Sequence, residues 1–170
     1  MLTMLRPILD RWRLFALLIS AGMLATAHAF QTFGGLAPCE LCLKQRVVYW
    51  VALGISAAAM VVVRLPGGPR WREASCWLLA LVFLASVGLA GYHAGVEWKF
   101  WPGPASCSGG GRVTVAALRD LLNGVGQKMP QCDQAAWRLF GVSMAGWNAL
   151  ASVVFTGLSV AAALRERSKA

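Results

Sequence analysis

Four long apolar runs constrain the fold of this chain more than any other feature of its sequence. They span residues 14–33, 43–63, 74–95 and 143–164. A transmembrane α-helix needs about 20 predominantly apolar residues, and each run is close to that length. The whole chain is 58% hydrophobic and only 14% charged, a composition that soluble domains seldom have. The sequence therefore predicts an all-α integral membrane protein, a single four-helix bundle over residues 1–170.

The first apolar run also has features of a cleavable secretory signal. Basic residues precede it, and the triplet Ala27-His28-Ala29 has the small residues of a cleavage site. The apolar stretch is long for a signal peptide, however, and its removal would leave three spans with the two termini on opposite sides of the membrane. We therefore expect an uncleaved first helix.

Basic residues mark one side of the predicted bundle. They precede the first helix, occupy the short connection between the second and third, and follow the fourth: Arg6, Arg11, Arg13, Arg64, Arg70, Arg72, Arg165, Arg167 and Lys169. Short segments rich in Lys and Arg stay in the cytoplasm. Both termini are therefore predicted to be cytoplasmic, with residues 34–42 and 96–142 as outer segments. The net charge of +9 then reflects membrane orientation and does not indicate nucleic-acid binding.

The five cysteines divide between the two sides of this layout. Cys39 and Cys42 fall in the first outer segment, Cys107 and Cys132 fall in the second, and Cys76 lies inside the third helix. Disulfides form and persist on the oxidising outer side, so the two outer pairs are expected to rest as disulfides. Cys76 is expected to be free, because buried structural thiols are usually inert.

The spacing of Cys39 and Cys42 indicates a redox-active pair. A bond between cysteines three residues apart constrains little chain, and Pro38 places the pair where a helix begins. A helix N-terminus lowers the pKa of a thiol and makes a dithiol reactive. For Cys107 and Cys132 alone a structural disulfide is the better interpretation, because closing a loop of about 25 residues stabilises a fold by about 3–4 kcal/mol.

Arg46 lies four residues after Cys42, on the same face of the predicted helix and one turn deeper in the membrane. An ionisable residue at that depth indicates a functional site. Its guanidinium is expected to stabilise the Cys42 thiolate and to hold an oxygen-bearing, electron-accepting ring against it. The alternative is an arginine that extends to the outer headgroups.

The second outer segment contains one further periodic stretch. Over residues 113–125, apolar side chains recur at helical spacing: Val115, Leu118, Leu122 and Val125. This pattern predicts a short amphipathic helix. The helix either lies on the membrane surface and carries the loop cysteines toward Cys39, or only packs on the bundle.

Several stretches of the chain together resemble one family of membrane proteins. They are PCELCLKQR at the start of the second helix, WPGPASC in the long outer segment and LFGVSMAGWNAL at the entry to the fourth helix. With four spans and a second cysteine pair, they resemble the disulfide bond formation protein B (DsbB) family over nearly the whole chain. One departure is mild: many members have an aromatic residue and a Glu where Lys44 and Gln45 stand.

The resemblance implies an enzyme of the bacterial inner membrane that reoxidises a periplasmic thiol oxidase of the DsbA type. It also implies that the electrons pass to membrane quinone, either ubiquinone or menaquinone. By the same resemblance, Cys107 receives the partner's attack and has Cys132 as its mate. Cys39 then exchanges with this loop pair, which is expected to be accessible from water, and Cys42 contacts the quinone beside Arg46.

Two alternatives from other classes stay open. The first is a non-catalytic membrane protein with two structural disulfides. The second is a membrane protein that binds a metal through cysteines, which the spacing disfavours because Cys₄ zinc sites usually repeat a close pair and a long stretch separates Cys107 from Cys132. We expect no metal ligands. His28 and His93 are interpreted as hydrogen-bonded helix residues, although His93 is placed where it can line a quinone pocket.

Overall fold

The computed structural model describes residues 2–104, 107 and 131–169. Its four long helices are α2 (Trp12–Thr32), α3 (Glu40–Val62), α4 (Trp71–Glu97) and α6 (Met144–Arg167). The short elements are α1 (Leu2–Asp10), the 3₁₀ helix η1 (Gly68–Arg70) and a hairpin of β1 (Arg138–Leu139) and β2 (Val142–Ser143). Each long helix is long and apolar enough to cross a membrane. The predicted four-helix membrane bundle is confirmed.

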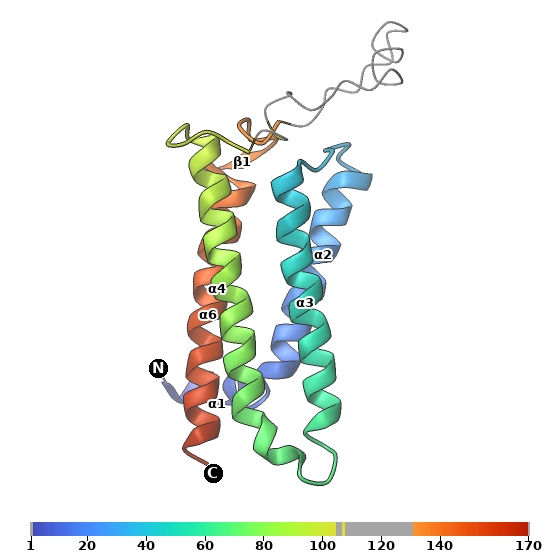
Figure 1. The fold of residues 1–170 in the computed structure, drawn as a ribbon, viewed down its shortest axis with the longest axis vertical. Helices are drawn as coiled ribbons and strands as arrows, with labels where there is room; N and C mark the ends of the chain where they lie inside the picture. The colour runs from blue at the N-terminus through green and yellow to red at the C-terminus, as the bar shows by residue number, and fades with distance from the viewer. Residues whose placement is uncertain (1, 105–106, 108–130, 170) are drawn as a thin grey trace, which may run out of the picture.

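The long helices run up and down, with short connections from α2 to α3 and from α3 to α4 and a much longer one from α4 to α6. α2 packs against α3, α3 against α4, and α4 against α6, which has the most extensive of these contacts (Figure 1). The start of α1 and the end of α6 lie at the same end of the bundle as η1, whereas the connection from α2 to α3 and the hairpin lie at the other end (Figure 1). The two cysteine-bearing segments therefore share the end remote from the termini.

The helix boundaries differ from the predicted ones by a few residues, and the difference at α3 matters for the site. This helix begins at Glu40, so Cys42 lies inside it and not in the outer segment 34–42. The reason is local capping: Cys39 has an extended backbone, and its Sγ accepts a hydrogen bond from the Cys42 backbone N–H at 3.4 Å. α1 was not predicted, and the amphipathic helix predicted over residues 113–125 lies outside the described residues.

A two-stranded hairpin within the predicted outer segment 96–142 leads the chain into α6. Its strands pair Arg138 with Ser143, and the two turn residues Phe140 and Gly141 both have positive φ, as a tight two-residue hairpin requires. Ser143 then caps α6, because its Oγ accepts a hydrogen bond from the Gly146 N–H at 3.1 Å. The hairpin thereby sets where α6 starts beside the end of α4.

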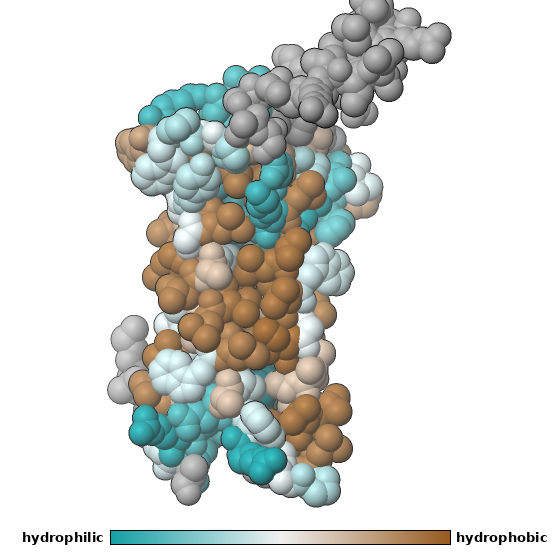
Figure 2. Space-filling view, in the orientation of Figure 1, coloured by the Kyte–Doolittle hydropathy of each residue, from teal (hydrophilic) through white to brown (hydrophobic). Residues whose placement is uncertain are grey.

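The middle of the bundle is covered by apolar side chains. Figure 2 shows a broad hydrophobic band between two more hydrophilic ends. Large exposed apolar residues occur on every long helix, among them Leu18, Val51, Leu81, Leu84, Val153 and Val154. A patch of this size exceeds what soluble monomers expose, whereas in lipid it is the expected surface. The surface supports the same multi-pass membrane protein as the helix lengths.

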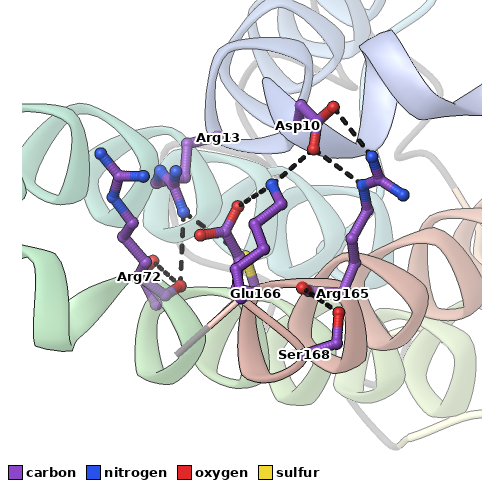
Figure 3. Close-up of polar contacts among 9 residues, drawn as sticks. Asp10, Arg13, Arg72, Arg165, Glu166 and Ser168 are labelled. Atoms are coloured by element: carbon purple, nitrogen blue, oxygen red, sulfur yellow. Dashed lines mark hydrogen bonds and ion pairs between the residues drawn. The ribbon is translucent and has the colours of Figure 1, made fainter.

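Polar contacts fasten the helices at the end of the bundle that holds the termini (Figure 3). Arg13 donates from Nη1 to the Arg72 carbonyl oxygen at 3.3 Å and lies 3.7 Å from the Cys76 Sγ. Asp10 accepts from the Arg165 Nε at 2.7 Å, which ties α1 to the end of α6. Cys76 is a free, buried thiol, as predicted. Arg13, expected as a flanking basic residue, is instead buried against α4.

Candidate functional site

The four outer cysteines lie together, although they come from distant parts of the sequence. They share one apolar cluster, whose buried members are Cys39, Leu41, Val96, Cys107 and Cys132, with Cys42 and Leu89 packed against it. The N-terminus of α3 supplies the first pair, and the end of α4 supplies the wall against which the loop pair packs. The two dithiol centres are therefore neighbours in space.

The two pairs differ in redox state. Cys107 and Cys132 form a disulfide with Cα atoms 5.2 Å apart, as predicted. Cys39 and Cys42 are free thiols whose Sγ atoms lie 3.1 Å apart. The structure thus holds this pair as a dithiol and not in the predicted resting disulfide. Only a small movement of the sulfur atoms separates the two forms, because a helical turn already brings the side chains together.

The loop disulfide is buried, which corrects the expectation that it is accessible from water. Cys107 is 4% exposed and Cys132 is fully buried. The physical reason is that a disulfide is largely apolar, and here it packs against Val96 and Leu41 at the end of the bundle. A thiolate can attack a disulfide only when it reaches a sulfur atom. Neither sulfur of the disulfide is therefore open to attack in the arrangement that the structure describes.

Aromatic contacts hold the start of the long outer segment on α4. The Trp101 ring covers Gly95, donates from Nε1 to the Tyr92 carbonyl oxygen at 2.9 Å, and stacks on the Tyr92 ring with centroids 6.0 Å apart. Lys99 Nζ pairs with Asp133 Oδ2 at 2.5 Å, which links the two ends of the segment that carries the disulfide. The disulfide loop is therefore anchored at its base.

We expect Gly95→Ala to destabilise this anchor. A Cβ at Gly95 would overlap the Trp101 indole, so the indole must move. Overpacking of this kind costs about 1–3 kcal/mol. Thermal unfolding in detergent should show a lower midpoint for Gly95→Ala. Gly91→Ala is the matched control, because nothing lies within 4 Å of its added Cβ. Equal midpoints for the two variants would contradict the proposed anchor.

A cavity of about 920 Å³ adjoins the Cys39–Cys42 pair. Its polar lining includes Cys42, Arg46 and His93, and its apolar lining includes Met23, Leu24 and Phe30. The lining side chains come from all four long helices, so the cavity exists only in the folded bundle. A mostly apolar cleft with a few polar groups is the usual form of a small-molecule site.

Arg46 lines this cavity and is fastened to α2. Its Nη1 donates to the Gln31 Oε1 at 2.6 Å, and its Nη2 donates to the Ala27 carbonyl oxygen at 3.0 Å. Among the described residues no hydrogen bond joins the guanidinium to Cys42, the thiol that it was expected to activate. These contacts use two of the N–H donors of a guanidinium, which has five. Arg46 is therefore oriented by α2 at the cavity wall.

Cys39 is the thiol whose surroundings stabilise the thiolate. The largest effect is the hydrogen bond with the Cys42 side chain at 3.1 Å. His93 Nε2 at 3.6 Å and the Cys42 backbone N–H at 3.4 Å add to it. Burial opposes these effects, and together they lower the pKa of Cys39 to about 4. The capping position explains why Cys39 benefits, since the N–H groups of a helix N-terminus point at its sulfur.

A buried polar network behind Cys39 was not found by the sequence analysis. Gln45 Nε2 lies 2.7 Å from His93 Nδ1, and Asn148 Nδ2 donates to Gln45 Oε1 at 2.5 Å. The Tyr49 hydroxyl donates to Asn148 Oδ1. Glu97 Oε1 lies 3.8 Å from His93 Nε2. All five residues are buried. The available signal was polar residues at i, i+4 spacing within apolar helices, where such residues face the bundle interior.

The metal-binding alternative can be tested against the geometry and the chemistry of the site. Ligand atoms of Cys39, Cys42 and His93 all lie within 4.8 Å of one another, close enough for one ion. A histidine binds a metal through a nitrogen lone pair, however. Gln45 Nε2 faces Nδ1 of His93, so Nδ1 accepts and Nε2, which faces the thiols, carries the proton. The hydrogen bonds therefore favour a redox dithiol over a metal site.

Comparison with known proteins gives the family of this chain. The family described as "Disulfide bond formation protein DsbB" matches residues 10–162. A "Disulfide bond formation protein B" of Dechloromonas aromatica (strain RCB) is 30% identical over 151 residues, covering 84% of this chain and 83% of that protein. Another of the same name, from Xanthomonas axonopodis pv. citri (strain 306), is 31% identical over 161 residues, covering 86% and 84%. "Uncharacterized protein RP370" of Rickettsia prowazekii (strain Madrid E) is 26% identical over 159 residues, covering 88% of each chain. The chain belongs to the DsbB family of disulfide bond formation proteins.

Proposed function

We propose that this protein is a thiol:quinone oxidoreductase of the bacterial inner membrane that reoxidises a periplasmic DsbA-type thiol oxidase. Family membership supports a role in disulfide bond formation. The observation that carries the proposal is the grouping of two cysteine pairs beside one cavity at the membrane boundary. Electrons can pass between centres that are neighbours, and the cavity offers room for the molecule that removes them.

The proposed orientation puts both termini in the cytoplasm and the cysteine pairs in the periplasm. The basic residues that suggest it lie on α1, around the start of α2, between α3 and α4, at the start of α4, and at and just after the end of α6. All of these positions are at the end of the bundle with the termini (Figure 1). Such residues favour the cytoplasmic side. Residues 1–170 act in this proposal as a single membrane domain.

The cavity fits a quinone by the chemistry of its lining. Met23, Leu24 and Phe30 offer an apolar wall for a ring and its isoprenoid tail. Arg46 offers charged N–H donors to a carbonyl oxygen, and Cys42 lies in the same wall. A bound quinone, ubiquinone or menaquinone, would supply an acceptor for two electrons and two protons. Arg46 binds and orients the ligand in this proposal, and α2 holds Arg46 in place.

The cysteines divide the work of thiol–disulfide exchange. A thiolate of the reduced partner attacks Cys107 and releases Cys132 as a thiolate, and the second partner thiol then displaces Cys107. The partner leaves as a disulfide, and the loop pair holds the two electrons. Exchange with a Cys39–Cys42 disulfide restores the loop disulfide and reduces Cys39 and Cys42. The structure, with the loop pair bonded and Cys39 and Cys42 free, has the same bonding as this last state.

The energetics of the partner require a strong electron acceptor. A DsbA-type disulfide has a reduction potential of about −120 mV, so transfer to glutathione at about −200 mV would be uphill by about 80 mV, or ~4 kcal/mol for two electrons. A more positive acceptor is needed, and it must reach a cavity bounded by membrane helices. A lipid-soluble quinone meets both conditions.

One assay tests the proposed function. Purified protein in detergent is mixed with a reduced DsbA-type partner and a soluble quinone analogue, and both quinone absorbance and partner thiols are followed. We expect two thiols to be lost for each quinone reduced. Failure of the protein to accelerate quinone reduction would reject the proposal in favour of two structural disulfides. Metal analysis of the same sample addresses the remaining alternative.

Cys132→Ser should trap the partner on Cys107. Cys107 has no disulfide mate in this variant, so its thiolate attacks the disulfide of an added oxidised partner, forms the mixed disulfide and releases one partner thiol. No second loop thiol is present to displace the partner. Non-reducing gels followed by mass mapping should show a one-to-one adduct that disappears on reduction. Cys76→Ala, which changes a thiol at the opposite end of the bundle, should form no adduct. A partner attached to Cys39 would show that Cys107 is not the entry site.

A further inference from the structure

The hydrogen bonds behind Cys39 have a direction. The Tyr49 hydroxyl donates to Asn148 Oδ1, Asn148 Nδ2 donates to Gln45 Oε1, and Gln45 Nε2 faces Nδ1 of His93. Each amide accepts with its oxygen on one side and donates with its nitrogen on the other. At the end of this chain the His93 Nδ1 has to accept, because an N–H there would oppose the Gln45 NH₂ group.

The other ring nitrogen of His93, Nε2, faces the Cys39 sulfur and the Glu97 carboxyl group. Nε2 lies 3.6 Å from the Cys39 Sγ and 3.8 Å from the Glu97 Oε1. The Cys39 sulfur already accepts from the Cys42 backbone N–H, and a carboxylate oxygen is an acceptor. With Cys39 as the thiolate and Glu97 as the carboxylate, both neighbours accept, and the nitrogen between them is then the donor. The two sides of the imidazole therefore agree on where its proton lies.

We propose that Gln45, Asn148 and Tyr49 are positioning residues that hold His93 in the tautomer with its proton on Nε2, aimed at the Cys39 sulfur. The inference deepens the proposed function, since Cys39 is the thiol that exchanges with the loop pair. Donation from Nε2 stabilises the Cys39 thiolate, which is the group that leaves when the loop pair displaces Cys39, and a thiol of lower pKa leaves faster. His93 acts on Cys39, and the other three residues act through His93.

The charged and titratable groups around Cys39 set the expected pH dependence. They are Cys42 on α3 and His93 and Glu97 on α4, with Arg46 in the wall of the same cavity and Arg138 of β1 attracting Glu97. The lowered pKa of Cys39, about 4, means that the thiolate persists in mildly acidic solution. Loss of the His93 donor raises this pKa, so the thiolate fraction falls first at low pH.

Nitrogen NMR of histidine-labelled, reduced protein tests the tautomer directly. The chain has two histidines, His28 and His93. His28 is an internal reference, because it is expected to have the opposite tautomer. His28 Nδ1 lies 2.8 Å from the Leu24 carbonyl oxygen and so must carry a proton. We expect one histidine protonated at Nδ1 and the other, assigned as His93 with a His28→Gln variant, protonated at Nε2. A proton on Nδ1 of His93 would overturn the inference.

Variants test whether the chain of hydrogen bonds sets this tautomer. Gln45→Glu replaces the donor by an acceptor and should draw the proton of His93 to Nδ1, whereas Gln45→Leu and the milder Tyr49→Phe should give mixed tautomers. Alkylation of Cys39 near pH 4, located by mass spectrometry, should slow by up to about twofold in Gln45→Leu, because about half of the His93 rings then lack the proton on Nε2. Thr156→Val, which removes another polar group of α6, is the matched control and should leave both readouts unchanged.

The outcomes separate this inference from the proposed function. Neither the NMR signals nor the alkylation rate requires a quinone or a partner protein. Unchanged tautomer and alkylation rate in both Gln45 variants would overturn the positioning role. A wild-type protein that has the expected tautomer but does not reduce quinone would instead refute the proposed function and leave the positioning role standing.

Discussion

Replacing Cys42 with Ser is expected to lower the rate of quinone reduction by at least about 1,000-fold, the scale on which enzymes lose activity when an essential nucleophile is removed. The Sγ atoms of Cys39 and Cys42 lie 3.1 Å apart, and a hydroxyl at either position cannot form the disulfide that passes on two electrons. The measurement is the steady-state rate with a reduced DsbA-type partner and a quinone analogue. Cys39→Ser should have a loss of the same size.

The fifth cysteine gives the matched control for this prediction. Cys76 is fully buried at the opposite end of the bundle, where the Arg13 Nη1 lies 3.7 Å from its sulfur. Cys76→Ala should retain the rate of the unaltered protein. If Cys42→Ser also retained that rate, the loop disulfide alone would deliver electrons to the quinone, and the relay through the helix pair would be wrong.

Arg46→Lys is expected to raise the KM for quinone by about 10- to 100-fold, which corresponds to the roughly 1.5–3 kcal/mol of a hydrogen bond to a charged group. The substitution keeps the charge but loses the planar fork, which in this structure binds Gln31 and the Ala27 carbonyl and still has donors for a ligand. The KM for the reduced partner should stay near normal, because Arg46 lies away from the loop disulfide. Steady-state kinetics with each substrate varied in turn give both values.

Two controls separate ligand binding from the packing role of Arg46. Gln31→Leu removes the α2 acceptor but leaves the guanidinium, so its effect on the KM should be the smaller one. Lys44→Ala removes a neighbouring cation that pairs with Glu40 at 2.7 Å on the outer face of α3, and it should change neither KM. An unchanged quinone KM in both Arg46→Lys and Arg46→Ala would reduce Arg46 to a tie between α3 and α2.

The fold of the bundle was predictable because its causes are local. Transfer of a segment into lipid depends on the side chains of that segment, so four apolar runs identify the four spans. The start of α3 is also set locally, since the Cys39 side chain caps it. The apolar run begins only at residue 43, but Pro38 and the cysteine pair already indicate a helix start before it. α1 and the hairpin were missed because neither is an apolar run.

The chemical identity of the site was also contained in the sequence. The spacing of Cys39 and Cys42 and the placement of four cysteines on one side needed no tertiary information. Sequence reasoning assigned the activated thiol to Cys42, beside Arg46. The structure instead stabilises a thiolate at Cys39, because a capping sulfur receives the helix N–H groups and because His93 approaches it from α4.

What only the tertiary structure decided is which distant side chains meet. The hydrogen bonds from Gln45 to His93 and to Asn148 join α3 to α4 and to α6. Arg46 turns toward α2, and the loop disulfide packs beneath Val96 and out of reach of water. Helical periodicity indicates which residues share a face of one helix, but the partner of that face depends on how the helices pack. The sequence by itself therefore determined four spans and the closely spaced pair Cys39 and Cys42, and the packing of the helices determined which of the two thiols lies among groups that stabilise a thiolate.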